Sequence, residues 1–286
     1  MKITIIGGAG RMGQLFAKHF ADRGFDVTIG DINCEAAEKV AEILDISVAD
    51  EERRCVEEAD ITLISIPIKE TPKVILDTAP LSKGRVLAEI ASIKRDTVEA
   101  LKKAANRGVK PLSIHPLFGP GVRALSGEKI AVIPVLNEEM EVEEAKQIFN
   151  ECKIFPVDVE THDHSMSLIL SLPYLVNLVF ASVISEKDIE TLRKLAGPNF
   201  DLHLLACESA LSQNPELYLS ILELDRHTEG IMRLLVKNAE ELKRMVEERE
   251  GLRDLVRQLR ERFSKGIEIE ESYEKMYMVW KSLRDS

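Results

Sequence analysis

Three glycines near the start constrain the fold of this chain more than any other feature of its sequence. They form a Gly-x-Gly-x-x-Gly pattern that follows an apolar run typical of a strand, Lys2–Ile6, and opens a helical stretch. Such a pattern makes a tight turn, lets backbone approach a pyrophosphate and lets helix and strand pack closely. Free N–H groups at the helix N-terminus then favour bound negative charge. The pattern predicts a dinucleotide-binding turn lined by Gly8, Gly10, Arg11, Met12 and Gly13.

An acidic residue lies where the second predicted strand ends. Asp31 follows the run Phe25–Ile29, at the spacing expected after the third glycine. A carboxylate here accepts hydrogen bonds from the adenosine ribose hydroxyls and repels a 2′-phosphate. Ile32 and Asn33 come next, so no arginine follows directly to pair with such a phosphate. We therefore expect NAD rather than NADP. The alternative is a generic glycine turn with Asp31 as a helix cap.

The pattern of elements predicts two domains. Short apolar runs alternate with helical stretches in the first part of the chain, which is typical of a parallel sheet covered by helices. After Val159 the strand signals fade and helical periodicity dominates. We expect a Rossmann-type doubly wound α/β domain over residues 1–160 and an all-helical domain over residues 161–286. The predicted strands are Lys2–Ile6, Phe25–Ile29, Ile61–Ile66, Arg85–Ile90, Lys110–Ile114, Lys129–Val135 and Lys153–Val157, and the later helices are Ser165–Ser185, Lys187–Ala196, Asp201–Gln213 and Pro215–Glu248.

Composition narrows the class of partner. The chain has 286 residues, a formal net charge of -11 and four cysteines that form no CxxC pair. An acidic surface disfavours electrostatic binding to nucleic acid or to an anionic membrane. Unpaired cysteines are typical of reduced thiols in a cytosolic protein. We expect a cytoplasmic protein whose partners are a small-molecule substrate and a second copy of the chain, with no nucleic acid and no membrane.

One uncharged segment, Ser165–Ser185, is long enough to cross a bilayer. It also contains several serines, Asn177 and Pro173, so we expect a buried helix at a subunit interface instead. So much apolar surface is difficult for one small domain to hide, which predicts a homodimer.

Candidate catalytic groups follow the predicted strands, because ligands of doubly wound sheets bind beyond the carboxyl ends of the strands. His115 follows the fifth long apolar run, and Ser92 follows the fourth. Lys94, a candidate substrate contact, also follows the fourth run, and Pro67, a candidate cofactor contact, follows the third. An imidazole with an ordinary pKa takes the proton of an alcohol that is being oxidised. Ser92 is a candidate to hydrogen-bond and orient it. The alternative is that His115 simply ends a strand before Pro116.

At these residues the chain resembles the prephenate dehydrogenases, from about residue 3 to about residue 235. The elements that carry the resemblance are GGAGRMG, ADITLISIPI, EIASIK, SIHPLFGP, HDHSMSLILSLPYL and NPELYLSILELDRHT. The resemblance implies NAD-dependent oxidative decarboxylation of prephenate to 4-hydroxyphenylpyruvate in tyrosine biosynthesis, or oxidation of its amino analogue arogenate.

The resemblance also implies roles for single residues. In the family, the histidine of the HP element, here His115, hydrogen-bonds the ring hydroxyl and promotes its deprotonation. The serine and lysine that match Ser92 and Lys94 lie close to the nicotinamide and to this histidine. A family arginine that binds a substrate carboxylate matches Arg226, or His227 if the alignment slips by one.

The sequence departs from the family pattern at Tyr174, where many relatives have a histidine after the SLP turn. A phenol still hydrogen-bonds a carboxylate but carries no charge at neutral pH. The substrate is expected between His115 and the second domain. His162 and His164, in THDH, are interpreted as a helix start and hinge, and no metal site is expected.

Two rival hypotheses remain open. One is a dehydrogenase of the same architecture that acts on a 3-hydroxy acid or an imine; such enzymes commonly use a lysine on the C-terminal helix, which has no clear equivalent here. The other is a non-catalytic NAD-binding regulator, which would bind cofactor without turnover.

Overall fold

The computed structural model describes residues 1–49, 52–266 and 268–284. Contacts within the chain divide it into two compact units. The first comprises Met1–Met166 and Leu219–Asp225, and the second comprises Ser167–Tyr218 and Arg226–Ser286.

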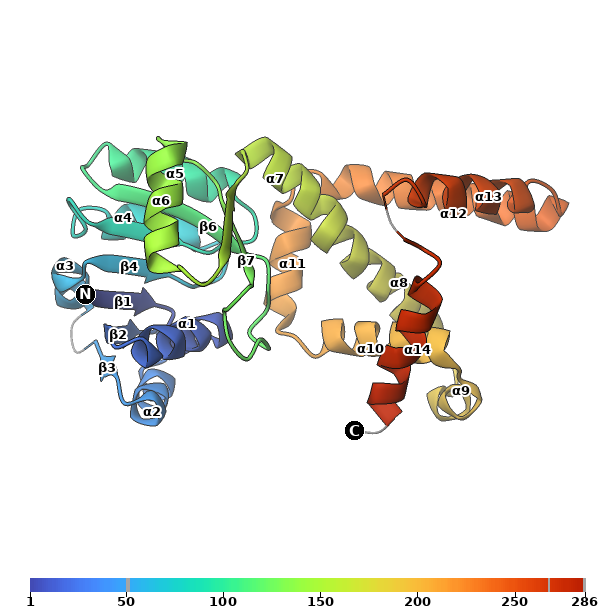
Figure 1. The fold of residues 1–286 in the computed structure, drawn as a ribbon, viewed down its shortest axis with the longest axis horizontal. Helices are drawn as coiled ribbons and strands as arrows, with labels where there is room; N and C mark the ends of the chain where they lie inside the picture. Colours follow the sequence, from blue (N-terminus) through green and yellow to red (C-terminus); the bar gives the residue numbers. More distant parts are fainter. Residues whose placement is uncertain (50–51, 267, 285–286) are drawn as a thin grey trace. The chain divides into compact units, whose positions relative to one another are not determined.

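Among the described residues, an eight-stranded sheet with the order β3-β2-β1-β4-β5-β6-β7-β8 forms the centre of the first unit (Figure 1). The six strands β1 to β6 are parallel to one another. Strand β7 pairs antiparallel with β6, and β8 pairs parallel with β7. The strand order reverses at β1, which is the switch point where doubly wound sheets bind ligands. The predicted Rossmann-type fold is confirmed. The strands are β1 (Lys2–Ile6), β2 (Asp26–Gly30), β3 (Ser47–Val48), β4 (Ile61–Ile64), β5 (Val86–Glu89), β6 (Lys110–Pro116), β7 (Lys129–Val132) and β8 (Lys153–Pro156).

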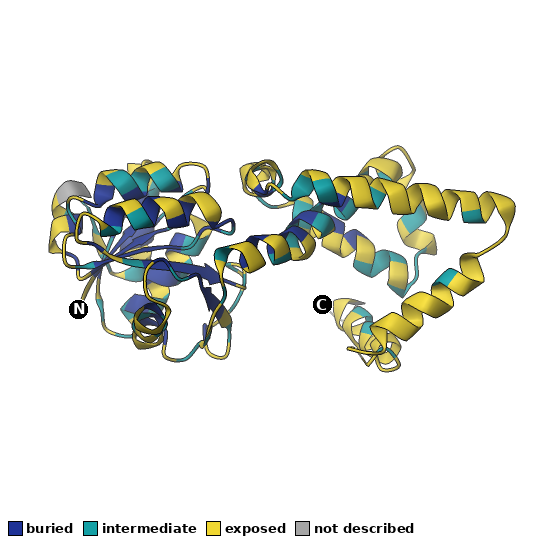
Figure 2. Ribbon diagram, turned by 90° about the horizontal axis from the view of Figure 1, so that it is seen from above, coloured by how far each residue is buried: buried dark blue, intermediate teal, exposed yellow. Residues whose placement is uncertain are grey.

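Helices cover both faces of this sheet, because strand side chains alternate between the faces and both sets are apolar. On one face, Ile3, Ile5 and Ile29 belong to a core with residues of α1 (Arg11–Asp22), α2 (Cys34–Leu44) and α6 (Glu138–Ile148). On the other face, Ile6, Ile64 and Leu87 belong to a core with residues of α3 (Glu52–Glu58), α4 (Thr71–Thr78) and α5 (Arg95–Ala105). The buried residues of the first unit therefore concentrate in and around the sheet (Figure 2).

His115 lies inside β6, whereas the sequence placed it after the strand. Antiparallel pairing with β7 holds this end of β6 in the sheet, with His115 opposite Ala131 and Pro116 opposite Ile130. The apolar run ends at Ile114, so only the pairing partner reveals that the strand continues. The carboxyl end of β6 shares an edge of the sheet with the carboxyl end of β1, because the strands between them are parallel.

The second unit is helical throughout its described residues, as predicted. It contains a π-helical turn (Ser167–Ser171), α8 (Leu172–Ser185), α9 (Ile189–Leu195), α10 (Pro198–Leu211), the first residues of α11 (Pro215–Leu224), α12 (Thr228–Glu248), α13 (Leu252–Phe263) and α14 (Ser272–Arg284). The predicted continuous helix Pro215–Glu248 is wrong, because it breaks at residues 225–227. Asp225 and His227 are weaker helix formers than the Leu and Glu around them, so the chain turns there and a new helix begins at Thr228.

The uncharged segment is not buried within the single chain. The helix Val159–Ser185 is long and apolar enough to cross a membrane by length and composition. Within α8 only Leu175 is buried, while Val179 and Val183 are 52% and 63% exposed. The expectation of a buried helix is therefore wrong for the single chain, because the other helices of the second unit leave much of α8 uncovered. Its place at a subunit interface stays a prediction.

Candidate active site

The glycine turn joins β1 to α1 in a conformation that excludes side chains. A Cβ at Gly8 would lie 2.4 Å from Cβ of Ile29, and one at Gly13 would lie 2.2 Å from the carbonyl oxygen of Gly7. Gly7 itself has a φ of 82°, and a Cβ there would lie 2.3 Å from the carbonyl oxygen of Ser65. Sequence reasoning missed Gly7, although it directly precedes the pattern. Glycine is therefore required at these positions by the close packing of the turn against Ile29, Ser65 and its own backbone.

The residues of this turn fit a dinucleotide. The N-cap of α1 is Gly10, and among the described residues no side chain caps that N-terminus. The N–H groups at this helix N-terminus are suited to donate hydrogen bonds to a pyrophosphate. Asp31 lies half-buried beside the turn, with Oδ2 accepting a hydrogen bond from N–H of Ala9 (3.1 Å) and Oδ1 from N–H of Asn33 (3.0 Å). This fixes a carboxylate next to the glycines, where the ribose role requires one.

The other predicted cofactor residues lie at the same edge of the sheet. Arg11 is exposed at the first position of α1, and Met12 is half-buried against the core. Pro67 is exposed after β4, and its carbonyl oxygen accepts hydrogen bonds from N–H of Glu70 and Thr71 where α4 begins. Their contact with a cofactor stays a prediction.

Beneath the carboxyl end of the sheet lies a buried ion pair. Nζ of Lys94 donates to Oε1 of Glu89 (2.7 Å) and to the carbonyl oxygen of Ile114 (2.6 Å), and neither charged side chain is exposed. Glu89 also accepts hydrogen bonds from Ser113, Thr97 and N–H of Ala91. Burial lowers the pKa of Lys94, while the attraction of Glu89 opposes that shift. The Lys94 ammonium faces the interior of the unit, so this placement gives no support to its predicted contact with substrate.

His115 is the first member of a chain of three side chains. Its Nδ1 lies 2.9 Å from Nε2 of His162, and Nδ1 of His162 lies 2.8 Å from Oδ1 of Asp163. All three are buried, with 5%, 1% and 5% of their surface exposed. Asp163 also accepts hydrogen bonds from N–H of Lys94 (3.0 Å) and of Arg95 (3.1 Å), where α5 begins. The partner of His115 Nδ1 is therefore His162, while the predicted partner, Ser92, lies half-buried in the turn between β5 and α5.

The surroundings of His115 favour its neutral form. Burial lowers its pKa well below the ordinary value, and the nearby Lys94 cation and His162 act in the same direction. A neutral imidazole has one nitrogen with a free lone pair, which is what a proton acceptor needs. The lowered pKa differs from the ordinary pKa assumed from the sequence: it keeps the lone pair available but also makes the imidazole a weaker base.

Sequence reasoning interpreted His162 and His164 as a helix start and hinge, and so missed the pair His162 and Asp163. They lie on α7 (Val159–Met166) and share its buried face with Met166. A histidine and an aspartate at adjacent positions, one turn before an apolar residue, were the available signal. Their partners in β6 and α5 are remote in sequence.

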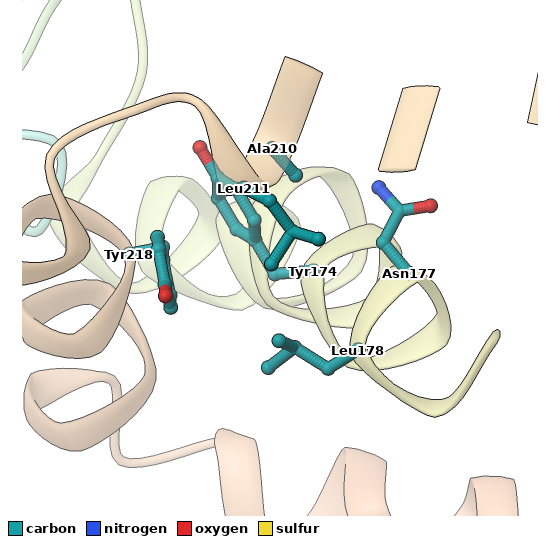
Figure 3. Close-up of a pocket in the computed structure, with 6 residues that line it drawn as sticks. All are labelled: Tyr174, Asn177, Leu178, Ala210, Leu211 and Tyr218. Atoms are coloured by element: carbon teal, nitrogen blue, oxygen red, sulfur yellow. The ribbon is translucent and has the colours of Figure 1, made fainter. Parts of the chain in front are cut away.

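Tyr174 belongs to the second unit. It lines a small pocket with Asn177 and Leu178 of α8, Ala210 and Leu211 of α10, and Tyr218 of α11 (Figure 3). Its ring stacks on that of Tyr218 with centroids 5.8 Å apart, and its hydroxyl donates to Oε1 of Gln213 (3.3 Å). Burial raises the pKa of Tyr174, so its phenol is neutral at neutral pH.

Arg226 and His227 lie at the break between α11 and α12. Arg226 is exposed and its Nε lies 3.3 Å from Nε2 of His227, which is the N-cap of α12. The sequence placed this arginine within the predicted helix Pro215–Glu248, whereas the structure places it in the turn between α11 and α12. Its role as a carboxylate anchor stays a prediction.

Comparisons with known proteins identify both units. A family model described as the nucleotide-binding domain of prephenate dehydrogenase matches residues 16–154, and one described as its dimerization domain matches residues 158–261. A probable arogenate/prephenate dehydrogenase of Methanocaldococcus jannaschii is 25% identical over 273 residues, covering 92% of this chain. The chain spans 61% of that relative's own length.

Solved structures of similar fold are known. A prephenate dehydrogenase from A. aeolicus, in complex with hydroxyphenyl propionate and NAD+, has a TM-score of 0.72 at 18% identity, over 93% of this chain and 98% of that one. An arogenate dehydrogenase from Synechocystis has a TM-score of 0.70 at 18% identity, over 93% of this chain and 100% of that one. At this identity the likeness concerns the fold.

The buried ion pair makes a stability prediction. Lys94→Met removes the cation and leaves the Glu89 carboxylate buried, so we expect the free energy of unfolding to fall by about 3–5 kcal/mol. Urea denaturation followed by circular dichroism measures this loss. Lys102→Met, on the exposed side of the same helix, is the matched control and should change stability by less than about 0.5 kcal/mol. Adding Glu89→Gln to Lys94→Met should restore part of the loss. Equal losses of stability in Lys94→Met and in the control Lys102→Met would contradict the prediction.

Proposed function

This chain belongs to the prephenate dehydrogenase family, and on that premise we propose that it catalyses the NAD-dependent oxidative decarboxylation of prephenate to 4-hydroxyphenylpyruvate. The observation that carries the proposal is the buried His115, at the same sheet edge as the glycine turn. The fixed Asp31 carboxylate beside that turn supports NAD over NADP.

The residues divide the chemistry between them. NAD, when bound, supplies the acceptor for the hydride of the ring carbon that bears the hydroxyl. His115 accepts the hydroxyl proton as the carbonyl forms, and loss of carbon dioxide makes the ring aromatic. The proton then returns to the phenolate oxygen, so His115 ends as it began. Because aromatisation supplies the driving force, the protein mainly orients and polarises the substrate.

The second candidate substrate is arogenate. The relatives reported above include proteins named for each substrate. Tyr174 presents a neutral phenol where many family members have a histidine, so this position does not supply a cation for the side-chain carboxylate. The two substrates differ at that side chain, which is why the choice between them depends on residues of the second unit.

We further propose a cytoplasmic homodimer. The match of residues 158–261 to a dimerization domain and the uncovered apolar side chains of α8 support it. A second copy covering this helix would remove those side chains from water.

A side-by-side assay tests the proposed activity. Purified protein with NAD should produce NADH absorbance with prephenate or arogenate, at a higher kcat/KM for one of them. Because burial and the Lys94 cation disfavour protonated His115, the acid limb of the kcat/KM profile should lie below pH 6.5. No NADH or NADPH with either substrate and either cofactor would refute the assignment.

Asp31→Ser tests the cofactor site. Removing the carboxylate deletes the ribose acceptor and the repulsion of a 2′-phosphate, so we expect weaker NAD binding and measurable NADP binding. Calorimetric titration with each cofactor gives the ratio of the two dissociation constants. Asp22→Ser, on an exposed residue of α1, is the control and should leave the ratio unchanged. The ribose role fails if Asp31→Ser also leaves it unchanged.

Arg226→Ala tests the carboxylate anchor. A lost charge-assisted hydrogen bond of about 1.5–3 kcal/mol should raise KM for the substrate by roughly 10- to 100-fold, with NAD binding unaffected. His227→Ala is the matched neighbour and should have the smaller effect. The opposite ranking would assign the anchor to His227.

A further inference from the structure

When both imidazoles are neutral, the chain His115–His162–Asp163 has one consistent arrangement of protons. Besides its contact with His162, the Asp163 carboxylate accepts hydrogen bonds from the N–H groups of Lys94 and Arg95 at the N-terminus of α5. Backbone N–H groups and the positive end of a helix stabilise an ionised carboxylate, which only accepts hydrogen bonds. Nδ1 of His162 must therefore carry a proton and donate it to Oδ1 of Asp163.

The tautomer of His115 follows from that of His162. A neutral imidazole protonated on Nδ1 has a lone pair on Nε2, so Nε2 of His162 is an acceptor. The 2.9 Å contact then requires that Nδ1 of His115 carries the proton. Nε2 of His115 is left as the nitrogen with a free lone pair. The other tautomer would set two lone pairs against each other in a buried site, which is costly.

We propose that His162 and Asp163 are positioning residues that hold His115 in the Nδ1-protonated tautomer, so that Nε2 is the proton acceptor. This inference rests on the proposed function for its catalytic consequence, although the tautomer itself does not depend on it. Neither residue needs to touch substrate or cofactor, because each acts through His115.

The same arrangement serves the protonated form. When Nε2 of His115 takes a proton, the ring donates from both nitrogens and His162 remains a suitable acceptor for Nδ1. The nearby Lys94 cation is itself paired with Glu89. The proton therefore binds without any partner having to move, which is the benefit of preorganisation in a catalytic site.

The test uses two substitutions at His162. His162→Phe keeps a planar ring of similar size but removes the acceptor, and His162→Gln retains an acceptor oxygen at the end of a flexible side chain. His164→Gln is the matched control, because it makes the same change on an exposed residue of the same helix. Circular dichroism establishes that each variant is folded.

The first measurement is ¹⁵N chemical-shift spectroscopy of the His115 ring in the full chain, without substrate or cofactor, with His115→Asn to assign its signals. We expect the proton on Nδ1 in the wild type and in His164→Gln, and a shift towards the Nε2-protonated form in His162→Phe. A wild-type ring protonated on Nε2 overturns the proposal. This measurement decides the tautomer even if His162→Phe does not fold, because the wild type and His162→Gln suffice.

The second measurement is steady-state kinetics with the substrate that the wild type turns over. We expect kcat of His162→Phe to fall by about 100-fold, within the range of general-base contributions, while KM changes less than about threefold. His162→Gln should recover roughly tenfold of that loss. An unchanged kcat and an unchanged pH profile in His162→Phe would overturn the positioning role.

The two proposals fail separately. If the wild type and His164→Gln turn over neither prephenate nor arogenate, the proposed function is refuted, while the ring spectra still decide the tautomer. If both are active and His162→Phe is equally active, the function stands and the positioning role of His162 is wrong.

Discussion

The carboxylate of Asp163 is the constraint on which the polar interior of the first unit depends. It binds the first N–H groups of α5, and through them it fixes where Lys94 leaves the backbone. It also binds His162, which in turn contacts His115 on β6. One acidic side chain on α7 thus links a helix N-terminus, a buried cation and the candidate proton acceptor. Helix N-termini and imidazoles both favour an anion here, so the contacts reinforce one another.

Burial gives the ion pair under the sheet its influence on His115. Neither Lys94 nor Glu89 is exposed, so little water screens the cation from the imidazole. Glu89 accepts hydrogen bonds from the turn after β5, from α5 and from β6, which keeps the pair in place and fixes the cation near the end of β6. The Lys94 cation would destabilise the fold if it were buried without Glu89, and once paired it helps to keep His115 neutral. Stability and reactivity are therefore set by the same group of contacts.

The two units satisfy different physical requirements. The first buries two apolar cores against a sheet whose glycine turn is closely packed. The second has few buried residues, and α8 exposes apolar side chains that a soluble chain normally covers. Its match to a dimerization domain supports the proposal that a second copy covers these side chains. Burial within a single chain is then a poor guide to burial in the assembly.

Short-range patterns in the sequence were sufficient to predict the doubly wound sheet, the glycine turn and the role of Asp31. These patterns are an apolar strand, three spaced glycines and an acidic residue at the end of the next strand. The sequence also singled out His115 and the helical second unit. It overextended the helix through Asp225, since helical periodicity continues on both sides of the break. It placed His115 outside its strand, because the pairing strand β7 is not visible in the run that precedes His115.

The surroundings of His115 became visible only in the folded structure. Lys94 looked like a ligand contact because it follows a strand, yet its ammonium turns inward to Glu89 and Ile114. His162 was interpreted as part of a hinge, yet it contacts His115, which is 47 residues away in the chain. Hydrogen bonds between groups so distant in sequence produce no periodic pattern in the sequence. The direction and the burial of a side chain are properties of the packed fold and not of a local run of residues.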